Sequence, residues 1–178
     1  ALIAKTTSKP WDGSEYKAGT VGGTWNSTML TDPKTFNQLI AERDSGSSAI
    51  IGKTLDFLVD YDPTFREWKG RLADFDIITD ENAGTLTVRY TLHDGLVWSY
   101  YGSEKTVPVT SDDFVFWYNE IAGDKAFAGS GYYQQFVTMA DGTEKHIDCV
   151  KIDERTFEFR FPRIVAEPIL ATNMGLCP

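Results

Sequence analysis

The sequence predicts an α/β chain of the α+β type, in which a mixed sheet carries most of the regular structure and helices are few. Three observations indicate this class. Residues 84–92 and residues 146–161 alternate apolar with polar side chains, as half-buried strands do. Residues 111–121 repeat apolar side chains at helical spacing behind a helix-start motif. With 178 residues, of which 42% are apolar, the chain is large enough to bury a core.

The first third of the chain is expected to hold one strand and one helix. Residues 1–18 show no periodicity and are interpreted as a flexible leader. Residues 22–30 are expected to form a short strand after a glycine turn. Residues 31–39 are expected to be an irregular loop, because Asp-Pro forces an extended residue before the proline. Residues 47–62 have apolar side chains at helical spacing behind two serines that can cap a helix, so we predict a helix ending before the next proline.

Two β-hairpins are predicted farther along the chain. In residues 75–92 the letters DENAG supply a turn before the strand TLTVRYTL. In residues 146–161 two strands flank Asp153 and Glu154. We expect both hairpins to lie in one antiparallel or mixed sheet. Its apolar face is predicted to carry Leu86, Val88, Tyr90, Leu92, Phe157, Phe159 and Phe161.

Asp112 and Asp113 are adjacent carboxylates and raise the question of a catalytic pair. Thr110 precedes Asp113 by three residues, which is close to the spacing of a capping box. Both acids would also lie at the positive end of the helix dipole. The apolar stripe that follows consists of Phe114, Trp117, Tyr118 and Ile121. The pair is therefore interpreted as the start of a helix over residues 111–121.

Composition restricts the possible partners. The 17 basic and 26 acidic residues give a net charge of -9, which disfavours nucleic acid and anionic membrane surfaces. No stretch approaches the roughly 18 continuous apolar residues that a membrane span requires. The first residues do not form a signal peptide, so we expect a mature or trimmed soluble product from which any export signal or lipid anchor has been removed.

The residues that most often carry catalysis or bind metals are scarce. Cys149 and Cys177 do not form a metal site, and their spacing leaves a disulfide between them open. His93 and His146 are the only histidines, so a histidine-rich metal centre is excluded. The sequence contains no nucleophile elbow, zincin motif or phosphate-binding glycine loop. We expect no cofactor, no metal and no enzymatic activity.

Residues 126–136, AFAGSGYYQQF, place Tyr132 and Tyr133 in a segment rich in glycine and serine. Tyrosines on an irregular loop are adaptable binding groups, because the ring is apolar and the hydroxyl is polar. The alternative is that one tyrosine packs inward and the other is merely amphipathic. The residues alone leave both interpretations open.

Several motifs, in this order, resemble the extracellular solute-binding proteins of family 5, which are the peptide-, oligopeptide- and nickel-binding receptors of bacterial ABC importers. The matching segments are GGT at 22–24, TDPKTFN at 31–37, LDFLVDYDP at 55–63, LTVRYTLHDGLVWS at 86–99, PVTSDDFVFWYN at 108–119, DERTFEFRFP at 153–162 and EPIL at 167–170. Each is weak alone, and their order and spacing carry the resemblance.

The resemblance implies a periplasmic-binding-protein fold of type II, in which two α/β lobes close on a ligand. Residues 19–44 and 169–178 would be pieces of the first lobe. Residues 45–168 would be the extra domain inserted into that lobe. The opposing C-terminal lobe is absent, so the resemblance implies that the chain is an N-terminal fragment of such a receptor.

The family resemblance also implies the ligand and the contact residues. The loop with Asp32, Pro33, Lys34 and Thr35 would lie along a bound peptide and pair with its backbone as an added strand does. Tyr132 and Tyr133 match a loop that approaches the ligand, and Asn173 is a further candidate. The implied partners are a small solute, most simply a peptide, and the membrane permease of an ABC importer. The implied location is the outer face of the cytoplasmic membrane, with a lipid anchor as the tether.

Two rival hypotheses come from other classes of protein. The chain could be a stand-alone β-rich module that binds a protein or glycan, which would present an exposed aromatic patch. It could also be a hydrolase with a carboxylate pair, which requires two acids that face each other in a cleft. The capping interpretation of Asp112 and Asp113 argues against the hydrolase.

Overall fold

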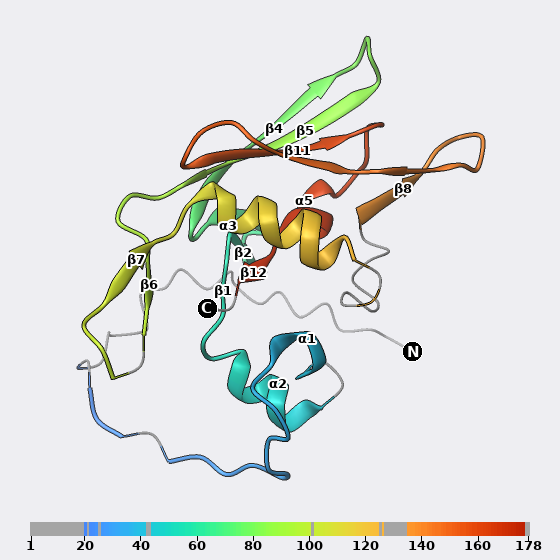
Figure 1. Ribbon diagram of the computed structural model, residues 1–178. Helices are drawn as coiled ribbons and strands as arrows, with labels where there is room; N and C mark the ends of the chain where they lie inside the picture. The colour runs from blue at the N-terminus through green and yellow to red at the C-terminus, as the bar shows by residue number, and fades with distance from the viewer. Residues whose placement is uncertain are drawn as a thin grey trace, which may run out of the picture.

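The computed structural model describes residues 20, 22–24, 26–41, 44–100, 102–124, 126 and 135–176. The described chain forms two parts (Figure 1). We call residues 26–51 the N-terminal unit and residues 56–176 the sheet-bearing part. The N-terminal unit contains two short helices, α1 (Gln38–Ala41) and α2 (Ser45–Ile51). Strands dominate the sheet-bearing part, as the sequence predicts.

A four-stranded antiparallel sheet organises the sheet-bearing part. Its order is β10-β11-β5-β4, with β4 (Ala73–Asp80) and β5 (Thr85–Leu92) as one hairpin. The second hairpin consists of β10 (Asp148–Lys151) and β11 (Thr156–Phe161). Both predicted hairpins and their union in one sheet are therefore confirmed. The register places Phe157 opposite Tyr90 and Phe159 opposite Val88, so their side chains share one face.

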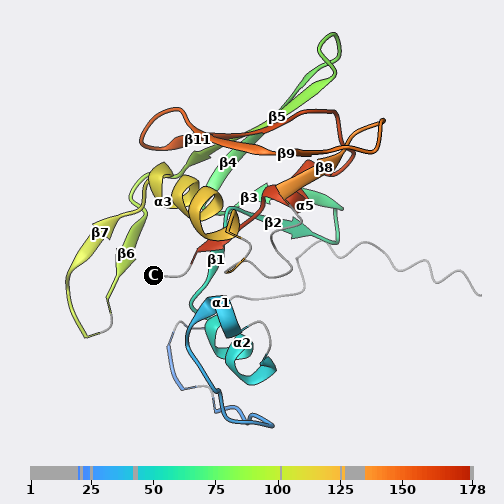
Figure 2. The ribbon, with the colours of Figure 1, turned by 45° about the vertical axis from the view of Figure 1, so that its right-hand side comes forward.

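The core lies between that face of the sheet and the helices that cover it, as Figures 1 and 2 show. These are α3 (Ser111–Phe116), its continuation η1 (Trp117–Ala122), and α5 (Pro168–Thr172). The seven apolar residues predicted for the buried face are all buried. The Phe114 ring of α3 stacks on Phe157 with 5.1 Å between ring centroids.

The helix expected at residues 111–121 is present, and it begins as predicted. Thr110 and Asp113 form a capping box, in which the Thr110 backbone N–H donates to Asp113 Oδ2 at 2.8 Å. Lys151 Nζ donates to Asp112 Oδ2 at 2.6 Å. From Trp117 the helix widens into π geometry, in which the backbone bonds span five residues. The two acids thus start a helix and secure it to strand β10.

We expect Asp113→Ala to lower the free energy of unfolding by about 1 kcal/mol, because the first turn of α3 loses its cap. Asp112→Ala is the matched control: its carboxylate is exposed and its ion pair with Lys151 should contribute only about 0.5 kcal/mol. Urea denaturation of both variants measures the difference. Equal losses would contradict the capping role of Asp113.

The helix predicted over residues 47–62 is correct only in its first turns. Helix α2 ends at Ile51, and Gly52 is its C-cap. The following residues form β1 (Asp56–Phe57) and β2 (Val59–Asp62). Strand β2 pairs with β3 (Glu67–Gly70) and buries Val59, so the hydrogen bonds of a hairpin replace those of the helix. Sheet pairing here overrides a local helical pattern.

The strand expected at residues 22–30 is wrong for the described part of that range. Residues 22–24 and 26–30 have no strand assignment and are exposed. A strand needs a neighbour to satisfy its N–H and C=O groups, and no described strand lies beside this segment. A preceding glycine turn was not enough to form a strand without a partner.

The remaining strands form three two-stranded sheets. Hairpin β6 (Val97–Ser99) with β7 (Thr106–Pro108) projects beside α3, and β8 (Phe136–Thr138) pairs with β9 (Glu144–His146). Strand β12 (Gly175–Leu176) pairs with β1. The segments through which the described chain enters and leaves the sheet-bearing part therefore lie side by side.

Candidate functional site

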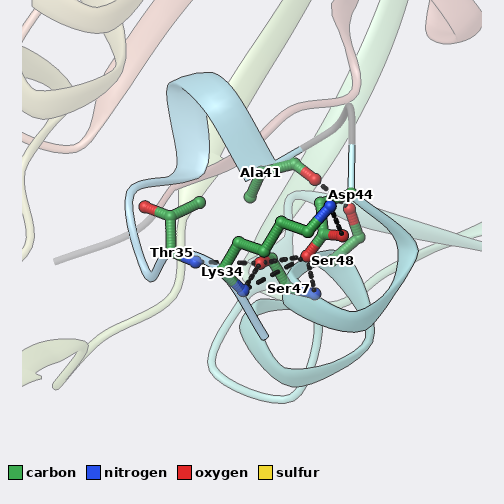
Figure 3. Close-up of polar contacts among 6 residues, drawn as sticks. All are labelled: Lys34, Thr35, Ala41, Asp44, Ser47 and Ser48. Atoms are coloured by element: carbon green, nitrogen blue, oxygen red, sulfur yellow. Dashed lines mark hydrogen bonds and ion pairs between the residues drawn. The ribbon is translucent and has the colours of Figure 1, made fainter. Parts of the chain in front are cut away.

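The loop at residues 31–37 is fastened to the start of helix α2 (Figure 3). Ser47 Oγ accepts hydrogen bonds from the backbone N–H groups of Lys34, at 2.9 Å, and Thr35, at 3.1 Å. The Ser47 hydroxyl donates to Asp44 Oδ2 at 2.5 Å. Asp44 is the N-cap of α2 and also accepts from the Ser47 N–H. The hydrogen bonds from Ser47 hold the pKa of the Asp44 carboxyl below its usual value.

This arrangement restricts what the predicted contact loop can offer to a ligand. The N–H groups of Lys34 and Thr35 point into α2, so they are already paired. Gly46 packs against the same loop, since a Cβ there would lie 2.9 Å from Thr31 Oγ1. Asp32 and the Lys34 side chain are exposed, and Pro33 and Thr35 are half-buried. Side chains and carbonyl groups of the loop therefore remain for a ligand, rather than its two central N–H donors.

Ser47→Ala tests how firmly the loop is held. Ser47 is fully buried, and the loss of its hydroxyl removes the acceptor of two backbone donors. We therefore expect the free energy of unfolding to fall by about 1–2 kcal/mol. Hydrogen exchange at the amides of Lys34 and Thr35 should become faster. Ser45→Ala, at an exposed position of the same helix, should leave both measurements unchanged. Unaltered exchange in Ser47→Ala would show that the loop is held by other contacts.

A pocket of about 360 Å³ lies between the N-terminal unit and the sheet-bearing part. Helices α1 and α2 form one wall, and η1, Gln135 and the end of α5 form the other. The apolar lining consists of Leu39, Ala41, Ile51, Gly52, Leu55, Trp117, Tyr118, Ile121, Ala122, Ala171 and Met174. The polar lining consists of Gln38, Ser48, Gln135, Thr172 and Asn173. No charged side chain is among these described lining residues.

Most polar side chains of the pocket are already hydrogen-bonded within the protein. Ser48 Oγ donates to the Ala41 carbonyl at 2.6 Å, and Gln135 Nε2 donates to the Tyr118 carbonyl at 2.8 Å. Thr172 Oγ1 lies 2.9 Å from the Tyr90 hydroxyl. Gln38 is the exception, because its Oε1 is buried without a hydrogen-bond partner in the described part of the chain.

Asn173 lines this pocket and also joins the segment after α5 to strand β2. Its Nδ2 donates to the Val59 carbonyl at 2.9 Å, and its Oδ1 accepts from the Val59 N–H at 3.1 Å. The side-chain amide therefore behaves as a strand partner for β2. A ligand beside Asn173 would meet an amide that is already held in place, which gives a rigid wall rather than a free pair of polar groups.

Of the five predicted site residues that the structure describes, one lines the pocket. Asn173 lies in its wall, whereas the Asp32–Thr35 loop does not line it. Tyr132 and Tyr133 lie outside the described residues. Sequence reasoning missed Gln38 and Leu39, which follow the predicted loop by only a few residues. The motif TDPKTFN stops just before them, so extending it by two residues would have found them.

The described residues include no cluster of three or more metal-binding side chains and no helix that could cross a membrane. Cys149 is a free, buried thiol whose pKa burial raises to about 12. Cys177 lies outside the described residues. Asp112 and Asp113 do not line the pocket.

Comparison with known proteins identifies a fold. No family model matches the chain, and no curated protein matches it significantly. One similar structure is a dipeptide-binding protein from Pseudoalteromonas sp. SM9913 in complex with Met-Leu, at 22% identity and a TM-score of 0.46, over 65% of this chain and 23% of that one. Another is the ABC transporter-associated periplasmic binding protein DppA from Helicobacter pylori in complex with the peptide STSA. It matches at 20% identity and a TM-score of 0.50, over 74% of this chain and 26% of that one.

The chain thus spans about a quarter of the length of these similar proteins. Its strands, helices and their order agree with the class that the sequence predicts. At this level of identity the likeness concerns the fold. The chain has the mixed α/β fold, rich in strands, of part of a periplasmic binding protein.

Proposed function

We propose that the chain is part of the substrate-binding receptor of an ABC importer and that the receptor captures peptides outside the cytoplasmic membrane. The observation that carries the proposal is the likeness of the fold to a periplasmic binding protein in complex with a peptide. The pocket between the two parts of the chain supports it, because ligand sites lie preferentially where separate structural units meet.

The receptor would work by changing the population of its conformations. A ligand that contacts two lobes favours the closed arrangement, and the closed form is what the permease would recognise. The present chain would supply one wall of the ligand site, with Leu39, Trp117 and Asn173 in the pocket and the Asp32–Thr35 loop beside it. This mechanism needs no catalytic group.

The division of the chain into lobe and insertion is part of the same proposal. Residues 19–44 and 169–178 would belong to the first lobe, and residues 45–168 to an inserted domain. Pairing of β1 with β12 supports an insertion, because β1, near the start of the proposed insertion, lies beside β12, which follows its end. A lipid anchor on the complete protein would fit the same role.

Native mass spectrometry tests the function on the product of the complete natural reading frame that contains this chain. The protein is measured as purified and again after denaturation, with a defined peptide mixture added in a parallel sample. We expect small species of peptide mass that are retained in the native state and released on unfolding. A protein that carries nothing and retains no peptide from the mixture would reject the receptor and favour the stand-alone interaction module.

A further inference from the structure

We infer that the pocket between α1–α2 and η1–α5 selects an uncharged, apolar side chain of the ligand. The inference rests on the proposed function, because it assigns the pocket to one side chain of a bound peptide. Its first support is volume. The pocket holds about 360 Å³, near the lower end of the range of roughly 300–1,000 Å³ for small-molecule pockets, and this volume suits one compact group.

The second support is the absence of charge in the described lining. A charged group that enters a site without a counter-charge loses its hydration and gains no ion pair, which is strongly unfavourable. Of the polar lining, the side chains of Ser48, Gln135, Thr172 and Asn173 are hydrogen-bonded to other groups of the protein, and so is the Tyr118 hydroxyl. The pocket therefore offers little to solvate an ammonium group or a carboxylate.

The third support is the nature of the available surface. Trp117 and Tyr118 present aromatic side chains, and Met174 adds a flexible, polarisable one. Burial raises the pKa of the Tyr118 hydroxyl above its usual range, so that group stays neutral. Among the described residues, the one buried side-chain polar atom without a partner is Gln38 Oε1, an acceptor that disfavours a ligand carboxylate and offers a ligand ammonium only a single neutral contact. Leu, Met, Phe and Trp side chains fit these conditions.

Isothermal titration calorimetry of the complete protein with three series of tripeptides tests the inference. The series are X-Ala-Ala, Ala-X-Ala and Ala-Ala-X, with X as Phe, Leu, Lys or Glu. In at least one series we expect Phe and Leu peptides to bind roughly 10–100-fold more tightly than Lys and Glu peptides. Equal affinities, or tighter binding of a charged residue, would overturn the selectivity and leave the peptide receptor standing. Failure of every peptide to bind would overturn both.

A matched pair of variants locates the selectivity in this pocket. Leu39→Glu places a carboxylate in the lining and is expected to reverse the preference, so that Lys peptides bind about 10-fold more tightly than Phe peptides. Ile40→Glu makes the same change at the neighbouring exposed position, which does not line the pocket, and should keep the original preference. An unchanged preference in a folded Leu39→Glu protein would overturn the assignment.

A neutral variant covers the case in which the new carboxylate prevents folding. Leu39→Gln has a similar size and no charge, and circular dichroism checks the fold of each variant. We expect Leu39→Gln to weaken Phe binding by roughly 5–10-fold without favouring Lys. Full retention of Phe binding by this variant would also overturn the role of the pocket.

Discussion

Phe114→Ala is expected to lower the free energy of unfolding by about 3–5 kcal/mol, the largest effect of any single change considered for this chain. Phe114 is 1% exposed and lies between α3 and the sheet. Its ring stacks on Phe157 at 5.1 Å, and Phe157 in turn lies 5.6 Å from the Tyr90 ring. Truncation would leave a cavity where the helix meets the sheet, and the rigid strands can close it only partly.

Phe116 provides the control on the same helix. It is 58% exposed, so Phe116→Ala should change the free energy of unfolding by no more than about 0.5 kcal/mol. Urea denaturation followed by near-ultraviolet circular dichroism measures both variants. Similar losses in the two variants would mean that α3 does not pack on the sheet as described.

Glu158→Gln is expected to lower the free energy of unfolding by about 2 kcal/mol at neutral pH. The Glu158 side chain is only 6% exposed, although it lies on the sheet face opposite the core. Arg89 donates two hydrogen bonds to Oε1, and Arg160 donates two to Oε2. The two guanidinium groups are about half exposed, which is why the expected loss is below that of a fully buried ion pair.

The pH dependence of this loss follows from the pKa of Glu158. Burial alone would raise that pKa, but the hydrogen bonds and charges of Arg89 and Arg160 outweigh burial and lower it. A carboxyl group with a lowered folded-state pKa contributes its full stability above the unfolded value of about 4.3. That stability is lost as the pH falls through the folded-state pKa.

The difference between wild type and Glu158→Gln should therefore be constant near pH 7 and shrink as the pH falls below about 4.3 and through the folded-state pKa. Denaturation curves at several pH values measure it. Glu81→Gln, in the exposed turn between β4 and β5, should differ from wild type by no more than about 0.5 kcal/mol across the same range. A Glu158→Gln difference that does not depend on pH would contradict the ionised cluster.

Local patterns in the sequence were sufficient to predict the structure of a segment whose own residues determine it. The strict alternation of residues 84–92 fixes which side chains face the core, because successive strand residues point to opposite sides. Likewise, Thr110 and Asp113 form a capping box within the first turn of α3, three residues apart in sequence. The hairpins, the buried aromatic residues and the structural role of the adjacent acids were therefore all predictable.

Segments whose structure depends on partners outside the segment were not predictable in this way. Residues 59–62 belong to the predicted helix of residues 47–62, yet β3 and the Asn173 amide hold them as a strand. Residues 26–30 read as a strand, yet no described strand lies beside them to pair with. Strand β2 is held both by its hairpin partner β3 and by Asn173, 114 positions away, whereas residues 26–30 have no described strand to pair with.

The sequence by itself determined the strand-rich class, the two main hairpins, the capped helix and the resemblance to solute-binding receptors. Only the tertiary structure decided where the pocket lies, because Leu39, Trp117, Gln135 and Met174 meet across long sequence separations. It also decided that the Lys34 and Thr35 N–H groups are bound to Ser47 rather than open to a ligand. Periodicity reports which side of its own element a residue occupies, whereas a pocket depends on how separate elements pack.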